Sequence, residues 1–193
     1  MKAIKNTIKA FACALLAFIM TSCIGEVVGE YSSHQCYYVM DFQCGHTTSY
    51  LFSALNSTNN FAIVRASSMN GTYTLTSEMY GSTTRQETIS EYELTRNTRC
   101  LGLNNNGVIV GRSSFQDGQL YVFDRQCPNC YNQYRYANYP LHFKDALNVE
   151  CSTCHRAYSL LNGGVVTSGD GGEKLFRYHA SYAGTLFSVQ NPQ

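Results

Sequence analysis

The sequence predicts an all-β fold, a small antiparallel β-sandwich, and three observations lead to this prediction. The composition favours strands, because the 193 residues include 15 Tyr and 10 Phe but only 3 Pro and no Trp. Short apolar or alternating runs follow one another, with turn residues between them. Two of these turns, Asn70-Gly71 and Asp117-Gly118, are typical of tight hairpins. Many short strands joined in this way are typical of small sandwiches and barrels.

The expected strands are taken in chain order from these runs. They are Asn60–Arg65, Thr72–Leu75, Gln86–Leu94, Gly107–Gly111, Gln119–Phe123, Leu147–Glu150, Ala157–Leu160, Lys174–Tyr178 and Thr185–Val189. Gly107–Gly111 and Gln119–Phe123 are the most apolar, and the turn between them predicts a central hairpin. Gln86–Leu94 alternates only partly, which is typical of a half-exposed strand. One short helix is expected over Ser49–Leu55.

The first 22 residues are expected to form a lipoprotein signal peptide. A basic stretch, Met1–Lys9, precedes an apolar run from Ala10 to Met20. This run is too short to cross a bilayer as a helix, which needs about twenty residues, but it suits the core of a signal peptide. The small residues before Cys23 resemble a bacterial lipobox, with an ordinary secretory signal as the alternative. Cys23 would then be acylated, residues 23–35 would form a tether, and residues 36–193 would form the domain.

Charge and missing motifs exclude several classes of function. Cleavage before Cys23 would remove three lysines and leave 11 basic against 13 acidic residues, so no nucleic-acid partner is expected. The chain has no G-x-S-x-G, no glycine-rich phosphate loop and no H-E-x-x-H. We therefore expect that the protein is not an enzyme. The signal peptide and Cys23 predict an exported protein that is anchored by lipid, on the outer membrane facing the periplasm. No protein or redox partner is indicated.

The main candidate site consists of two C-x2-C pairs, Cys127 with Cys130 and Cys151 with Cys154. Two residues between cysteines let a tight turn direct both sulfurs at one ion, and a second such knuckle completes a tetrahedron. The sequence therefore predicts a metal site of four thiolates. The alternative is a pair of C-x2-C disulfides, which an oxidising compartment permits.

The segment around these cysteines resembles a Rieske domain. The likeness is carried by Phe123–Pro128, Cys151–Leu160, Asn162–Gly164, Leu175–Tyr178 and Leu186–Val189, and it covers about residues 100–193. The resemblance implies a β-sandwich base with an inserted ligand-binding subdomain, here about residues 127–160. Rieske centres use C-x-H and C-x2-H, whose two histidines hold one iron.

Both Rieske histidine positions differ in this chain. Asn129 stands at the C-x-H position and Cys154 stands where the second histidine belongs, with His155 one residue out of phase. Four thiolates suit Zn²⁺ in a closed structural site, with a single iron or an all-cysteine [2Fe–2S] electron-transfer cluster as the alternatives. We expect zinc, because a chain exported unfolded cannot carry a preassembled cluster.

Three further cysteines and four tyrosines complete the candidate residues. Cys36 and Cys44 close the shortest loop and are expected to form a disulfide, which leaves Cys100 free. The tyrosines between the knuckles are expected to supply the subdomain with a core, with shielding of the site from water or stacking on a partner as the alternatives. They are Tyr131, Tyr134, Tyr136 and Tyr139.

Overall fold

The computed structural model describes residues 30–90, 100–136 and 138–191. Residues 31–193 form one compact unit, and the description below concerns that unit. The expected signal peptide and Cys23 lie outside the described residues. Antiparallel strands dominate the fold, which confirms the predicted all-β class. Among the described residues no helix has the length and apolar character needed to cross a membrane.

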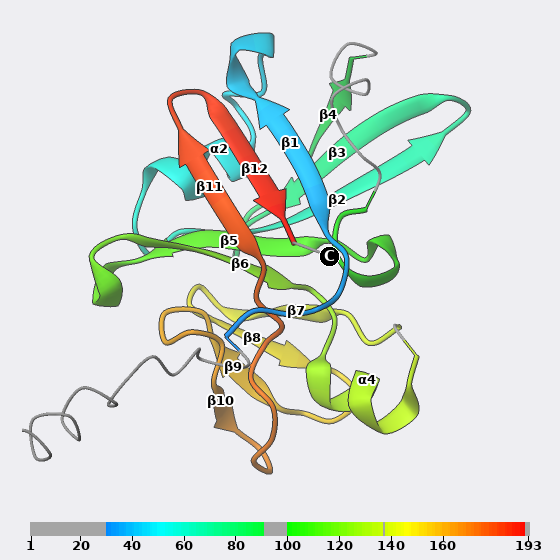
Figure 1. Cartoon of the computed structure of the whole chain (residues 1–193), viewed down its shortest axis with the longest axis vertical. Helices are drawn as coiled ribbons and strands as arrows, with labels where there is room; N and C mark the ends of the chain where they lie inside the picture. Colours follow the sequence, from blue (N-terminus) through cyan, green and yellow to red (C-terminus); the bar gives the residue numbers. More distant parts are fainter. Residues whose placement is uncertain (1–29, 91–99, 137, 192–193) are drawn as a thin grey trace, which may run out of the picture. The chain divides into compact units, whose positions relative to one another are not determined.

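The largest sheet has five strands in the order β4-β3-β2-β5-β6 (Figure 1). Its strands are β2 (Phe61–Met69), β3 (Thr72–Glu78), β4 (Arg85–Ile89), β5 (Val108–Ser113) and β6 (Gln119–Asp124). β5 and β6 form the expected central hairpin, with Val110 opposite Val122. Helix α2 (Tyr50–Asn56) contacts this sheet and begins at Ser49, whose side chain accepts a hydrogen bond from the Phe52 N–H. The helix was therefore predicted within one residue.

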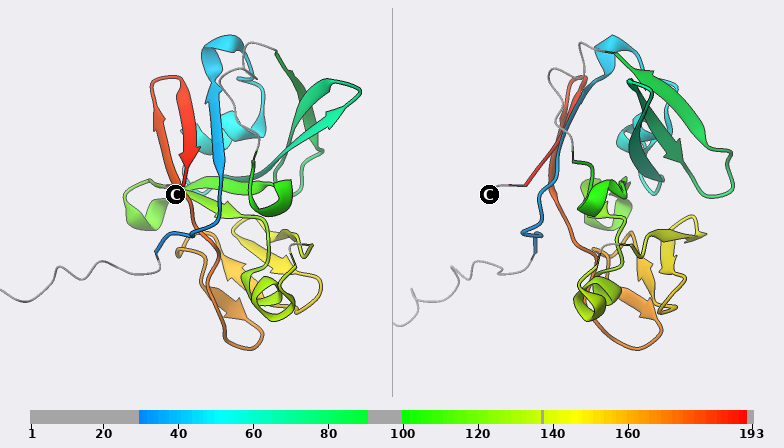
Figure 2. Two further views of the ribbon diagram at one scale, coloured as in Figure 1. Left: turned by 45° about the vertical axis from the view of Figure 1, so that its right-hand side comes forward. Right: turned by 90° about the vertical axis from the view of Figure 1, so that its right-hand side faces the viewer.

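A second sheet of three strands, in the order β1-β12-β11, packs against one face of the large sheet. Its strands are β1 (Tyr37–Asp41), β11 (His179–Ala183) and β12 (Leu186–Gln190). The edge-on view shows the two sheets as facing layers (Figure 2). The core between them includes Met40 of β1, Phe187 of β12 and Val64 of β2, each at most 1 % exposed. This arrangement is a two-layer sandwich.

A smaller unit is inserted between β6 and β11. It consists of helix α4 (Pro128–Tyr134) and a four-stranded sheet in the order β10-β9-β8-β7. These strands are β7 (Leu141–Asp145), β8 (Asn148–Cys151), β9 (Ala157–Ser159) and β10 (Val166–Ser168). We call residues 125–173 the inserted subdomain. In the sequence the subdomain was expected to end near residue 160, whereas its sheet continues to Ser168.

The five-stranded sheet is buried on both faces because its strands alternate between two cores. In β2, Ala62 and Val64 face the sandwich core, while Phe61 and Ile63 face a second core. This second core also contains Leu141 and other apolar residues of the inserted subdomain. The subdomain therefore has no separate core of its own, and it is held on the base by shared apolar packing.

One predicted strand is wrong and several elements were not predicted. Residues 174–178 are irregular, with only an isolated bridge between Arg177 and Phe123, and the strand begins at His179 instead. Among the described strands and α-helices, the ones not predicted are β1, β7, β10, β11 and α4. The later half of the predicted strand Gln86–Leu94 lies outside the described residues, and its first half is β4.

The expected disulfide between Cys36 and Cys44 is also wrong, because both are free thiols. β1 separates the two residues, and its five residues alone extend about 16 Å at the rise of a strand. Bonded cysteines have Cα atoms only about 4.4–6.8 Å apart. Cys36 is buried and lies close to Cys100, since the Tyr37 N–H donates to the Cys100 carbonyl at 3.1 Å. Cys44 is exposed.

Candidate metal centre

The four predicted cysteines come together in the inserted subdomain. Their sulfur atoms all lie within 4.8 Å of one another. The separation is 3.7 Å between Cys127 Sγ and Cys154 Sγ, and also 3.7 Å between Cys130 Sγ and Cys151 Sγ. Four sulfurs that each lie about 2.3 Å from one ion would be about 3.8 Å apart. The cluster therefore has the size of a tetrahedral site for a single metal ion.

Neither C-x2-C pair is a disulfide in this structure. All four cysteines are free thiols. The two 3.7 Å separations join sulfurs of different knuckles, and each is far longer than the S–S bond of about 2.05 Å. The geometry favours the metal site over the alternative of two C-x2-C disulfides.

The first knuckle is the start of α4. Cys127 is the N-cap residue and Pro128 occupies the first turn, where proline's missing N–H removes no helical hydrogen bond. The helical turn places Cys130 three residues later, on the same side as Cys127. The Tyr131 N–H donates to the Cys127 carbonyl at 3.0 Å and closes the turn.

Two buried polar side chains fix the entry to this knuckle. Asp124, at the end of β6, accepts hydrogen bonds from the Gln126 N–H at 2.5 Å and the Tyr178 hydroxyl at 2.5 Å. Burial raises the pKa of the Asp124 carboxyl to about 6. Gln126 donates through Nε2 to the Cys127 carbonyl at 3.0 Å and accepts from the Tyr139 N–H at 3.0 Å. Neither residue was predicted from the sequence. The one feature of the sequence that could have pointed to them is their position shortly before Cys127.

The second knuckle is the turn between β8 and β9. The His155 N–H donates to the Cys151 carbonyl at 2.9 Å, and His155 has a positive φ of 56° that reverses the chain. His155 itself is exposed. His142 also lies outside the sulfur cluster, where its Nε2 is 3.4 Å from Glu150 Oε1. Neither histidine takes the place of a missing Rieske ligand.

Three of the four thiols have shifted pKa values. The hydrogen bond from Cys127 and backbone N–H groups lower the pKa of the Cys151 thiol to about 4. That same hydrogen bond and burial raise the pKa of Cys127, and burial together with neighbouring thiols raises the pKa of Cys130 to about 12. Deprotonation is thus favoured at Cys151 and disfavoured at Cys127 and Cys130. A bound divalent cation would favour deprotonation of all its cysteine ligands, because metal ligation requires deprotonated sulfur.

A chain of hydrogen bonds supports the first cysteine from outside the cluster. Asn129 Nδ2 donates to the Tyr158 hydroxyl oxygen at 2.9 Å, which leaves the Tyr158 proton to be donated to Cys127 Sγ at 3.2 Å. Tyr158 is fully buried, and burial raises the pKa of its hydroxyl, so it remains a donor. Hydrogen bonds of this kind orient and tune metal ligands.

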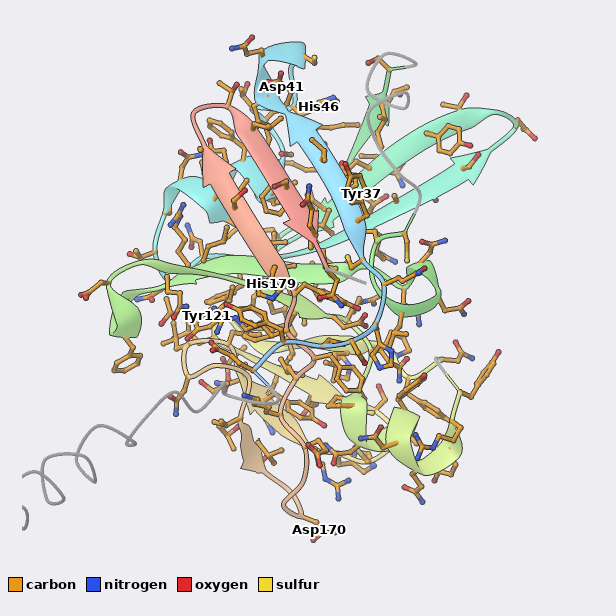
Figure 3. The ribbon with its side chains drawn as sticks, in the orientation of Figure 1. Tyr37, Asp41, His46, Tyr121, Asp170 and His179 are labelled. Atoms are coloured by element: carbon orange, nitrogen blue, oxygen red, sulfur yellow. The ribbon has the colours of Figure 1, made fainter. Side chains whose placement is uncertain are left out.

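The loop between β10 and β11 is hydrogen-bonded to both knuckles. Asn129 exchanges two hydrogen bonds of 3.0 Å with the backbone of Glu173. Arg156 donates through Nε to the Asp170 carbonyl at 2.8 Å, and its guanidinium also bonds to Cys154. Asp170, labelled in Figure 3, lies at the tip of this loop. Cys154, the one sulfur ligand that is not buried, therefore lies next to a positive charge.

The tyrosines between the knuckles do not form the core that the sequence predicts. Tyr134 and Tyr136 are 50 % and 59 % exposed, and Tyr131 and Tyr139 are only partly buried. The second core instead uses Tyr158 and aliphatic residues of the subdomain together with aromatic residues of the base sheet, such as Tyr121 and Phe123. The four tyrosines between the knuckles can stay outside this core because Tyr158 and the large sheet supply the apolar surface.

Comparison with known proteins adds no relative. No protein-family model matches the chain, and neither a curated protein nor a solved structure matches it. The Rieske resemblance therefore stays a prediction from the sequence motifs.

Proposed function

We propose that Cys127, Cys130, Cys151 and Cys154 bind one Zn²⁺ as a closed structural centre that holds the inserted subdomain together. The observation that carries this proposal is the sulfur cluster, whose 3.7 Å separations match the edges of a zinc–thiolate tetrahedron. Four protein ligands fill the usual coordination of zinc, so no position stays open for a substrate. The role we assign is accordingly non-catalytic.

The proposed setting is an exported lipoprotein with a Rieske-like domain, anchored to the membrane through Cys23. The Rieske-like assignment is supported by a β-sandwich base that carries an inserted sheet and both cysteine knuckles. The anchor is supported by the N-terminal sequence alone. In this setting the protein would present a rigid, metal-stabilised domain outside the cytoplasm, as a binding or structural module.

A single iron is the second candidate, and the Tyr158 hydroxyl bonded to Cys127 favours it. Hydrogen bonds to cysteine sulfur shift the reduction potential of iron centres, so in an electron carrier this contact would tune the potential of the iron. A [2Fe–2S] cluster is less compatible with the structure. Its two irons must be bound by separate pairs of cysteines, whereas all four sulfurs here converge within 4.8 Å.

Metal analysis and visible absorption of the purified protein test both candidates. We expect colourless protein with about one zinc per chain, as four thiolates around one site require. Substituted Co²⁺ should then give the strong visible bands of tetrahedral thiolate ligation. Red protein with one iron per chain would show that the site holds iron, the second candidate, and not zinc. Protein without metal, in which Co²⁺ produces no thiolate bands, would overturn the metal centre itself.

A further inference from the structure

A polar groove of about 640 Å³ lies on the five-stranded sheet beside the inserted subdomain, and the metal centre does not use it. Its lining contains two arginines, and the remaining side chains are mostly hydroxyls and amides. The residues used below are Arg65, Ser67, Thr76, Gln86, Asn105 and Arg125.

The groove begins where the subdomain stops covering the sheet. Phe61 and Ile63 of β2 face the second core, and the alternation of the strand places Arg65 and Ser67 on the same face. β5 pairs with β2 only from Phe61 to Val64. From Arg65 onward the face changes from apolar to polar, so these residues add nothing to the core and present their polar groups to the groove.

Strand register arranges a row of polar side chains across three strands. Arg65 of β2 lies opposite Thr76 of β3, and Thr76 lies opposite Gln86 of β4. Residues that are opposite in antiparallel strands point to the same face, so a guanidinium, a hydroxyl and an amide lie side by side. Such a row offers both donors and acceptors to a ligand that carries hydroxyl groups.

Gly107 contacts both Arg65 and Arg125 and helps to position them. A Cβ atom at Gly107 would come within 2.7 Å of Arg65 Cγ, so only glycine lets the stem of Arg65 pack there. The carbonyl of Gly107 accepts the Arg125 N–H at 3.1 Å. Arg125 is further fixed by its own side chain, which donates to the Leu141 carbonyl at 3.0 Å and the Asn106 carbonyl at 3.3 Å. The two guanidinium groups are thus held in place before any ligand binds.

The positive charge of the groove is only half compensated by the described residues. Arg65 Nη2 lies 3.2 Å from Glu78 Oε2, whereas the Arg125 side chain donates its hydrogen bonds to neutral carbonyls. Burial and then the nearby charge of Arg65 lower the pKa of Arg125. In addition, the buried Nε of Arg65 has no hydrogen-bond partner among the described residues. An anion in the groove would relieve the repulsion and supply acceptors.

We propose that this groove binds a small hydroxyl-bearing molecule through an oxyanion, either a carboxylate or a phosphate. The oxyanion would lie between Arg65 and Arg125, because guanidinium groups bind both kinds of oxyanion with paired hydrogen bonds. The hydroxyls of the ligand would bond to Thr76, Gln86 and Asn105. This inference is independent of the metal centre.

Titration of the ¹⁵N-labelled full chain, followed by NMR at constant ionic strength, tests the proposal. The probes are glucuronate, which carries a carboxylate, glucose 6-phosphate, which carries a phosphate, and glucose as the uncharged control. We expect saturable shifts at the amides of Arg65, Thr76 and Arg125 with one or both charged probes and none with glucose. The charged probe that saturates identifies the oxyanion. Equal shifts with glucose, or no saturable shift with either charged probe, would overturn the proposal.

Matched variants separate recognition from general charge effects. Arg65→Gln should weaken binding about tenfold or more, as expected for a lost charge-assisted hydrogen bond. Glu78→Gln should tighten binding, because it releases Arg65 from its ion pair, and a purely structural role of Arg65 would not produce this gain. Arg85→Gln is the control, since Arg85 precedes Gln86 on β4 and its guanidinium instead lies over the Tyr50 ring. Unchanged affinity in Arg65→Gln, or an equal loss in Arg85→Gln, would contradict the proposed site.

Discussion

Replacing one buried sulfur ligand should show how much of the fold depends on the metal. Cys130 has no exposed surface, and its sulfur lies 3.7 Å from Cys151 Sγ. In Cys130→Ser the hydroxyl is a much poorer zinc ligand than a thiolate, so the metal should be lost or bound weakly. The buried hydroxyl would also have to find a partner in a site built for a metal.

The expected loss of stability follows from linkage. Metal present at about 1,000 times its dissociation constant stabilises the folded state by about 4 kcal/mol. An unsatisfied buried hydroxyl adds about 1 kcal/mol to the destabilisation. In a domain of this size each kcal/mol shifts the Tm by about 2–4 °C, so Cys130→Ser should lower it by about 15 °C.

Thermal unfolding with and without a chelator measures this effect. The chelator should lower the Tm of the wild type toward that of Cys130→Ser and leave the variant nearly unchanged. Cys44→Ser is the matched control, because Cys44 is an exposed thiol outside the cluster and should behave like the wild type. If Cys130→Ser and wild type unfold at the same temperature and respond equally to the chelator, the metal does not stabilise the fold.

Hydrogen exchange should locate the damage. Because the second core joins the inserted subdomain to the large sheet, protection should fall in β7–β9 first and to a smaller extent in β5 and β6. The sandwich core between the two base sheets should keep its protection. Unchanged exchange in β7–β9 of the variant would contradict the proposed role of the metal.

Three other predictions address single groups. Tyr158→Phe keeps the buried ring but removes the hydrogen bond to Cys127, so metal affinity measured by chelator competition should fall about tenfold; unchanged affinity would refute this supporting role. Cys23→Ala should remove the protein from the membrane fraction, and equal labelling of wild type and variant by a fatty-acid analogue would rule out acylation at Cys23. Burial raises the pKa of Asp124 to about 6, above its ordinary value of 3.8, so this group's contribution to stability is complete below about pH 3.8 and is lost as the pH rises through 6. In urea unfolding, wild type should therefore lose about 2 kcal/mol more than Asp124→Asn between pH 4 and 6, and parallel pH profiles would contradict it.

The parts of the fold that the sequence predicted are those determined by local patterns. The apolar hairpin of β5 and β6 and the short helix predicted over Ser49–Leu55 depend on neighbouring residues, and the structure contains both. The convergence of Cys127, Cys130, Cys151 and Cys154 was also predictable, because C-x2-C spacing determines the shape of each knuckle. The predicted strand over residues 174–178 failed for a tertiary reason. Leu175 and Tyr178 are apolar because they enter the two cores from an irregular segment, and not because they alternate in a sheet.

Long-range partners account for the other errors. The pairing of Cys36 with Cys44 considered loop length but not the stiffness of the strand between them. The tyrosines between the knuckles looked like core residues because the sequence does not show that the base sheet supplies Phe61, Ile63 and Tyr121 to the subdomain. Asp124 and Gln126 were missed for the same reason, since their partners Tyr178 and Tyr139 are recognisable only once the chain has folded.

The three-stranded sheet places the two ends of the domain next to each other. β12 lies in its centre, paired with β1 from Tyr37 opposite Gln190 to Asp41 opposite Leu186. β12 thus supplies the hydrogen-bonding partner of both β1 and β11, although about 145 residues separate Asp41 from Leu186 along the chain. Pairing between segments so far apart in sequence is slow to form during folding, because the loop between them has to close first. A chain truncated before Leu186 would leave both β1 and β11 as unpaired edges.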